Sequence, residues 1–213
     1  MRVGIFDSGI GGINVLKELI RKYPNNEYLF YGDTLNLPYG SKTIDQLKAY
    51  ACNIIDFLIS KNVDLIIVAC GTISSNCYRY LKEKYNIPIF DIVSPTLRYI
   101  ESSPYNKIGV IATERTIESK IFEQNSKVNQ VKATKNFVKI IEDGIIDKEE
   151  KQEIKNELKC FDNKIDALVL GCTHYPFITK IINDYLNVPL IDMGKCLTDE
   201  LDLSTNGNTK IDL

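Results

Sequence analysis

An internal repeat constrains the fold more strongly than any other feature of this sequence. Three apolar segments of the first half have counterparts in the second half, in the same order: RVGIFDS (2–8) and KIGVIAT (107–113), DLIIVACGT (64–72) and DALVLGCTH (166–174), IPIFDI (87–92) and VPLIDM (188–193). The displacement is 101 to 105 residues in each case. One matched segment would mean little, but three in order predict two similar lobes.

Amphipathic stretches separate these strand-like segments. Apolar residues at helical spacing follow the first segment until Pro24, and the stretches 43–61 and 74–85 have the same character. A further strand is expected over 27–33. Alternating strands and helices are typical of parallel sheets covered on both faces. The predicted fold is therefore α/β, with two pseudo-symmetric lobes, each a mostly parallel sheet flanked by helices, and an active site in the cleft between them.

The repeat also predicts the boundaries of the lobes. We expect residues 1–95 to form the first lobe and residues 96–189 the second. The remaining segment, 190–213, is expected to return to the first lobe. The polar stretch LSTNGNTKIDL (203–213) has the composition of a frayed end.

Composition and charge exclude several classes of protein. The formal net charge is −2 and no block of Lys and Arg stands out, which argues against a nucleic-acid partner. The longest apolar runs, such as 65–70, have five to seven residues and are too short to cross a bilayer. Met1 and Arg2 lead directly into a strand-like run, so no signal peptide is expected. These features predict a cytoplasmic protein that binds no membrane.

The six cysteines do not follow a zinc-binding or disulfide pattern. Without a secretory signal we expect reduced thiols, several of them buried as small apolar residues. Two of them occupy equivalent places in the repeat: Cys70 lies six residues after Asp64, and Cys172 lies six after Asp166. Each ends a strand just before an expected helix. Because ligands bind at the carboxyl ends of parallel strands, the two thiols are predicted to face one cleft.

Two opposed thiols suit the racemisation of a carbon acid. One thiolate removes the α-proton from one face while a thiol returns a proton to the other. Each cysteine has a candidate helper. His174, the only histidine, can stabilise a thiolate at Cys172, and Asp7 ends the strand expected beside that of Cys70.

Loops near these residues have the composition of ligand-binding loops. DSGIGG (7–12) provides glycines and backbone N–H groups at the start of a helix, and LPYG (37–40) is a Pro/Gly turn. Four hydroxyl residues are further candidates for binding carboxylate oxygens: Ser8, Thr72, Thr116 and Thr173. Alone, the LPYG turn is more often a simple loop, and each of these hydroxyl residues is more often a helix cap.

Taken together, these residues resemble the aspartate/glutamate racemase superfamily, and within it the glutamate racemases most closely. The resemblance covers about residues 1–194 and rests on six motifs: GIFDSGIGG (4–12), YGDTLNLPYGSKT (31–43), IVACGT (67–72), IGVIATERTIES (108–119), IIEDG (140–144) and LGCTHYPFI (170–178).

The resemblance implies a cofactor-independent enzyme that interconverts L- and D-glutamate and, in bacteria, supplies D-glutamate for peptidoglycan. It implies that Cys70 and Cys172 are the opposed acid and base, assisted by Asp7 and His174 respectively, with Glu142 near the site. It places the following residues at substrate contacts: Ser8, Pro38, Tyr39, Gly40, Thr72 and Thr173. It also implies a small acidic amino acid as the partner, no metal, and a homodimer.

Three departures from the family pattern stand out. Gly71 occupies the position after the first cysteine, where the family usually has an asparagine that binds the substrate. The absence of that asparagine side chain is expected to weaken substrate binding by roughly 1–3 kcal/mol unless another group replaces it. The segment before Glu142 lacks the usual Cys-Pro, and the last helix is shortened or absent.

Other functions remain open at this level. The substrate is glutamate, aspartate or another small acidic compound, or the chain is a non-catalytic paralogue that binds an acidic ligand, as Gly71 would allow. A zinc site made by Asp7, Cys70, Cys172 and His174 is a further alternative, although Cys-x-His is a rare spacing for zinc ligands.

Overall fold

Two parallel sheets, one in each lobe, form the framework of the molecule. The computed structural model describes residues 1–204 and 210–212. The first sheet has the strand order β4-β3-β1-β2-β9, and the second has the order β6-β5-β7-β8. The first sheet contains β1 (Arg2–Asp7), β2 (Glu27–Gly32), β3 (Leu65–Val68), β4 (Ile89–Asp91) and β9 (Lys210–Asp212). The second contains β5 (Ile108–Ala112), β6 (Val128–Ala133), β7 (Ala167–Gly171) and β8 (Leu190–Asp192).

The two sheets share one topology, which confirms the predicted two-lobe α/β fold. The order β4-β3-β1-β2 in the first lobe corresponds to β8-β7-β5-β6 in the second. Each repeated segment of the sequence therefore occupies the same place in its own sheet. The central strand β1 pairs in parallel with both β2 and β3, and β5 pairs in the same way with β6 and β7.

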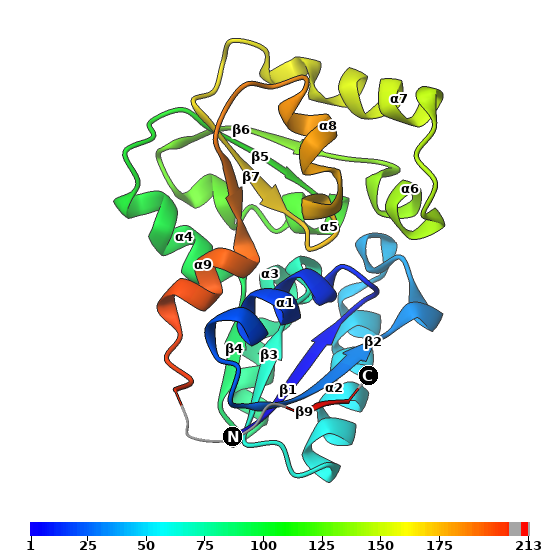
Figure 1. Cartoon of the computed structure of the whole chain (residues 1–213), viewed down its shortest axis with the longest axis vertical. Helices are drawn as coiled ribbons and strands as arrows, with labels where there is room; N and C mark the ends of the chain where they lie inside the picture. The colour runs from blue at the N-terminus through cyan, green and yellow to red at the C-terminus, as the bar shows by residue number, and fades with distance from the viewer. Residues whose placement is uncertain (205–209, 213) are drawn as a thin grey trace.

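Helices cover both faces of each sheet, as Figure 1 shows. The helices are α1 (Gly12–Lys22), α2 (Ile44–Ser60), α3 (Gly71–Lys84), α4 (Val93–Ser102), α5 (Glu114–Glu118), α6 (Phe137–Asp143), α7 (Lys148–Leu158), α8 (Thr179–Asn183) and α9 (Met193–Glu200). The helix predicted over 43–61 is α2, which begins at a capping box formed by Thr43 and Gln46. The helix predicted from residue 74 begins earlier, at Gly71, so that Cys70 is its N-cap residue.

One apolar core is continuous between the lobes. It includes Ile5 and Ile67 of the first sheet together with Val110 and Val169 of the second, all fully buried. Helix α9 packs against α1 and α4 beside this core and lies at the junction of the lobes in Figure 1. Separate apolar clusters cover the outer face of each sheet. Burial of these side chains joins the lobes into one body and directs their strand ends toward each other.

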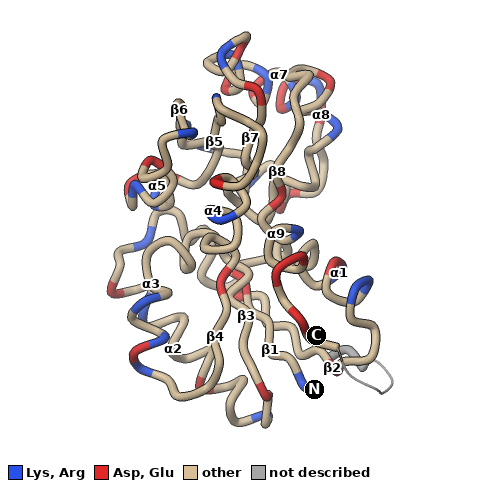
Figure 2. The backbone as a smooth tube through the Cα atoms, turned by 90° about the vertical axis from the view of Figure 1, so that its left-hand side faces the viewer, with Lys and Arg blue, Asp and Glu red and all other residues tan. Residues whose placement is uncertain are grey.

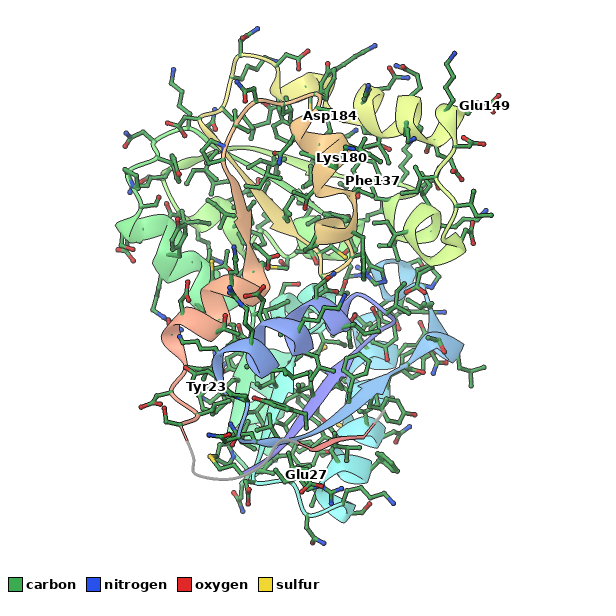
Figure 3. The ribbon with its side chains drawn as sticks, viewed as in Figure 1. Tyr23, Glu27, Phe137, Glu149, Lys180 and Asp184 are labelled. Atoms are coloured by element: carbon green, nitrogen blue, oxygen red, sulfur yellow. The ribbon has the colours of Figure 1, made fainter. Side chains whose placement is uncertain are left out.

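The chain after β8 is tied to the first lobe. Tyr23, labelled in Figure 3, follows α1, and its hydroxyl donates to the Leu201 carbonyl just after α9. Strand β9 pairs with β2 in the first sheet. The predicted divisions at residues 95 and 189 stay predictions, and part of the stretch predicted to fray, 205–209 and 213, lies outside the described residues.

Charges on the outer helices are mixed in sign. Figure 2 shows Lys and Arg interspersed with Asp and Glu along α7. Among the described residues, no helix has both the length and the apolar character that a membrane span requires.

Candidate active site

A cavity of about 550 Å³ lies between the lobes, where the strands that carry the two predicted cysteines end. The lining includes both Cys70 and Cys172, one from each lobe. Most of the other predicted site residues also line it: Ser8, Pro38, Tyr39, Gly40, Gly71, Thr72, Thr173 and His174. The exceptions are Asp7, Glu142 and Thr116. Each of them forms a hydrogen bond with a lining residue: Asp7 with Thr173, Glu142 with His174, and Thr116 with Thr113.

Cys70 is held in an environment that favours the neutral thiol. Its Sγ lies 3.7 Å from the Oγ of Ser8, which follows β1. Burial, and next the negative charge of Asp7, raise the pKa of the Cys70 thiol well above its ordinary value. Cys70 is therefore a neutral thiol in the unliganded protein.

Asp7 lies behind the cavity and joins the two lobes. Its Oδ2 accepts hydrogen bonds from the Gly12 N–H at 2.7 Å and from the Thr173 hydroxyl at 3.2 Å. Its Oδ1 is buried without a partner among the described residues. Burial raises the pKa of this carboxyl, in spite of these hydrogen bonds and the nearby charge of His174. A buried carboxyl with a raised pKa beside Cys70 is suited to proton transfer with that thiol.

Cys172, His174 and Glu142 form a hydrogen-bonded relay. The Nδ1 of His174 lies 3.6 Å from the Sγ of Cys172, and its Nε2 lies 2.6 Å from the Oε1 of Glu142. Burial opposes a charge on His174, but hydrogen bonds with Cys172 and Glu142 raise its pKa to about 10. For Glu142 burial also favours the neutral form, yet the hydrogen bond with His174 prevails and lowers the pKa. An imidazolium thus stands beside Cys172, the kind of neighbour that activates cysteines in other proteins.

The segment after Cys172 differs from the prediction. Cys172 was expected to lie just before a helix, but Tyr175–Ile178 form a short 3₁₀ helix that begins beside Pro176. Only five residues of α-helix follow it in α8. So short a helix provides a weak dipole, and His174 is the main positive group next to this sulfur.

The turn Leu37–Ser41 closes one end of the cavity. Tyr39 is almost fully buried, stacks on Tyr50 with ring centroids 5.6 Å apart, and donates a hydrogen bond of 2.5 Å to Asp33. These contacts fix the turn, and Pro38 and Gly40 line the cavity. The structure is consistent with the predicted substrate-binding turn.

A chain of threonine hydroxyls crosses between the lobes. The Oγ1 of Thr72 lies 2.9 Å from that of Thr113, which in turn lies 3.0 Å from that of Thr116. Thr116 was predicted to contact the substrate, but its hydroxyl is directed to Thr113 and it does not line the cavity. Thr113 lines the cavity instead. The repeat indicates this residue, because Thr113 follows β5 as Ser8 follows β1.

The remaining lining residues were not predicted. They are Leu37, Ser41, Thr113, Glu114, Val131, Lys132, Ala133, Thr134, Lys135 and Val138. Several come from the end of β6 and the segment before α6, where the family resemblance is weakest. Lys132 is paired with Glu157 at 3.6 Å, whereas Lys135 is exposed.

The metal-site alternative requires a cluster of ligands. Within residues 1–204 and 210–212, no three His, Cys, Asp or Glu side chains are grouped closely enough to hold a metal ion. All six cysteines are free.

The fold and the site together define a class: two-lobed α/β proteins with a thiol from each lobe at one inter-lobe cavity. The sequence profile of the Asp/Glu/Hydantoin racemase family matches residues 13–201, and the chain belongs to this family.

Three similar glutamate racemases support this assignment. A glutamate racemase of Aquifex pyrophilus is 35% identical over 222 residues, which span 100% of this chain and 87% of the relative. The structure of a glutamate racemase from Thermus thermophilus, in complex with β-chloro-D-alanine, aligns with a TM-score of 0.88 at 33% identity, over 99% of this chain and 85% of that one. A glutamate racemase from Francisella tularensis, in complex with D-glutamate, aligns with a TM-score of 0.86 at 31% identity, over 99% and 86% of the two chains.

Proposed function

We propose that this protein is an amino-acid racemase that interconverts L- and D-glutamate by a two-base mechanism without a cofactor. The observation that carries the proposal is the placement of Cys70 and Cys172 at one cavity, from equivalent positions of the two lobes. The similar proteins described above are glutamate racemases, and one of them was solved with D-glutamate bound. These similarities support an acidic amino acid as the substrate.

The environments of the two thiols support a different starting role for each. Cys172, beside the His174 imidazolium, is the thiolate that removes the α-proton. The electron pair left on the α-carbon is delocalised into the substrate carboxylate. Cys70, kept neutral by burial and Asp7, donates its proton to the opposite face. The substrate has then inverted, Cys172 is a thiol and Cys70 a thiolate, and the reverse reaction uses the opposite pair.

Substrate binding is assigned to groups that line the cavity. Hydroxyls of Ser8, Thr72 and Thr173, with the backbone of the turn Leu37–Ser41, provide donors for the carboxylate oxygens. Thr113 adds a hydroxyl from the second lobe. Holding the α-carbon between two sulfurs provides the orientation that proton transfer requires.

Three wider expectations belong to this proposal. The D-glutamate formed would serve peptidoglycan synthesis, the protein would act in the cytoplasm, and two copies would form a homodimer. They rest on the family resemblance, and size-exclusion chromatography with light scattering tests the last of them.

The test is an exchange experiment in deuterated water. L- or D-glutamate is incubated with the protein, the α-proton is followed by NMR, and chirality is measured in parallel. We expect deuterium incorporation with inversion, and a smaller or no effect with aspartate. If neither acid shows exchange at high protein concentration, the chain is a binding paralogue and the proposal fails.

Two single variants test the assignment of the thiols. Cys70→Ser and Cys172→Ser are each expected to reduce racemisation by about 10²–10⁴-fold, since a serine hydroxyl is a far weaker base than a thiolate. Cys160→Ser, a cysteine that does not line the cavity, is the matched control. Wild-type rates in either active-site variant would contradict the two-thiol mechanism. Metal analysis of protein purified without chelator tests the zinc alternative.

A further inference from the structure

Gly71 and Gly171 bring the two lobes into backbone contact directly beside the two active-site thiols. Gly71 is the first residue of α3 and follows Cys70, while Gly171 is the last residue of β7 and precedes Cys172. A Cβ atom added at Gly71 would lie 2.8 Å from the carbonyl oxygen of Gly171 and 3.2 Å from the Cε of Met193. The first of these separations is shorter than any ordinary contact. A side chain at position 71 therefore requires the backbone to move.

The second lobe is closely packed around Gly171. A Cβ atom at Gly171 would lie 2.6 Å from the carbonyl oxygen of Ile111 and 2.9 Å from the Cβ of Ala112, both in the neighbouring strand β5. Gly171 pairs with Ala112 in the centre of the second sheet. A clash at position 71 would thus be relieved by moving the end of β3 and the start of α3 away from β7, since close-packed interiors transmit such displacements.

The contact lies between the backbones that carry both sulfurs. Proton removal and proton return require each sulfur to be within about 3–4 Å of the substrate carbon, on opposite sides. We infer that the Gly71–Gly171 contact sets the span between the Cys70 and Cys172 thiols, which makes Gly71 a positioning residue for racemisation. This inference rests on the proposed function. It also means that the glycine at position 71 has a structural role in this chain, in addition to removing the asparagine side chain.

The two halves of the reaction respond differently to a wider span. Removal of the α-proton needs one sulfur only. The resulting thiol can exchange its hydrogen for solvent deuterium and return a deuteron to the same face, which labels the substrate without inverting it. Inversion needs the second sulfur to donate a proton from the opposite face. Widening the span therefore slows inversion more than it slows exchange.

The experiment measures inversion and exchange with retention for Gly71→Ala in deuterated water. We expect the ratio of inversion to exchange to fall by about 10- to 100-fold, the loss typical of a displacement near 1 Å. Gly109→Ala is the matched control. Its Cβ would also lie 2.8 Å from its nearest neighbour, the ring of Phe161, but it lies in β5 away from the cavity. The control is expected to lose stability with an unchanged ratio.

The outcomes separate this inference from the proposed function. Absence of both reactions in the wild-type protein would contradict the proposed racemase. An active wild type with the same ratio in Gly71→Ala would overturn the inference, as would a faster inversion in Gly71→Asn. Unfolded molecules perform neither reaction, so the ratio does not depend on the fraction that folds. If Gly71→Ala gives no folded protein, the double variant Gly71→Ala with Met193→Ala is measured in its place. It removes the 3.2 Å contact with Met193, and the same fall in the ratio of inversion to exchange is expected.

Discussion

His174 and Glu142 are joined by a hydrogen bond of 2.6 Å between Nε2 and Oε1, and the same carboxylate oxygen accepts the N–H of Ile10 at 3.0 Å. Ile10 belongs to the glycine-rich loop of the first lobe, whereas the other two residues belong to the second. A Cβ atom at the neighbouring Gly9 would lie only 2.2 Å from this carboxylate oxygen. The relay behind Cys172 is thus completed by the backbone of the opposite lobe.

The first prediction concerns the charge on this relay. Glu142→Gln removes the negative partner that helps to hold the pKa of His174 near 10. We expect the alkaline limb of the kcat/KM profile to move to lower pH by about 1 unit or more, because a lost charge partner lowers a histidine pKa by that order. The profile is measured with L-glutamate between pH 6 and pH 11.

The control for this variant is Glu149→Gln, which replaces an exposed carboxylate on α7 that does not line the cavity and is labelled in Figure 3. It should leave the profile unchanged. An equal shift in both variants would show that the overall charge of the protein, rather than the Glu142–His174 contact, determines the pH at which the alkaline limb falls.

The second prediction concerns stability. The folded-state pKa of His174 is raised from 6.5 to about 10, so its stabilising contribution is fully present below pH 6.5 and is lost as the pH rises toward 10. We expect the difference in free energy of unfolding between wild type and His174→Gln to fall over this range, by an amount on the order of a few kcal/mol. Urea unfolding at several pH values measures it. A constant difference would mean that His174 is neutral in the folded protein.

The sequence predicts most of the fold because its information is local and repeated. Buried parallel strands such as Leu65–Val68 are continuous apolar runs, and the repeat duplicates them. Strand β6, VNQVKA, was missed because it is a half-exposed edge strand without such a run. Helices α6 and α7 were also not predicted, since their few buried residues give a weak pattern.

The site could be predicted only where motif and repeat agree. Cys70 and Cys172 follow corresponding strands, and Ser8 follows the strand beside that of Cys70, so topology brings them together. The contact between Ile10 and Glu142 joins residues 132 positions apart, and it depends on how the lobes pack, which no local pattern encodes. The contact of Gly71 with Gly171 likewise depends on how the lobes pack. The sequence shows only that the expected asparagine is absent at position 71, whereas the structure shows that a Cβ atom there would lie too close to the Gly171 carbonyl oxygen.

The third prediction concerns the buried carboxyl of Asp7. Burial raises its folded-state pKa above the ordinary value of 3.8, so the cost in stability is absent below about pH 3.8, grows as the pH rises from there to the raised pKa, and is constant above it. Asp7→Asn stays neutral. We expect it to increase the free energy of unfolding at pH 8 by about 1–3 kcal/mol, with a smaller gain at pH 4. Racemisation should fall by about 10²-fold because Cys70 loses its proton-transfer partner.

The matched control for Asp7→Asn is Asp91→Asn. Asp91 is also buried with a raised pKa, at the end of β4, but it does not line the cavity. This variant should change stability and leave racemisation near the wild-type rate. A gain in both stability and activity in Asp7→Asn would contradict the role assigned to this carboxyl.

The last prediction concerns Lys135, which lies at the cavity where the family resemblance is weakest. The other lysine of the lining, Lys132, is paired with Glu157, whereas the ammonium of Lys135 has no ion-pair partner among the described residues. It is therefore available to attract a substrate that carries two carboxylates. We expect Lys135→Glu to raise KM for glutamate by about 5- to 10-fold with little change in kcat, since surface charges contribute about 1 kcal/mol.

Ionic strength and a neighbouring lysine test whether this effect is electrostatic and local. The difference in KM should shrink at about 1 M salt, where the screening length falls to about 3 Å. Lys139→Glu, an exposed residue of α6 that does not line the cavity, makes the same change of charge. It should raise KM less than Lys135→Glu does. Equal effects in the two variants would show that the cation acts through the field of the whole protein, and a large loss of kcat in Lys135→Glu would show that it instead orients the reacting groups.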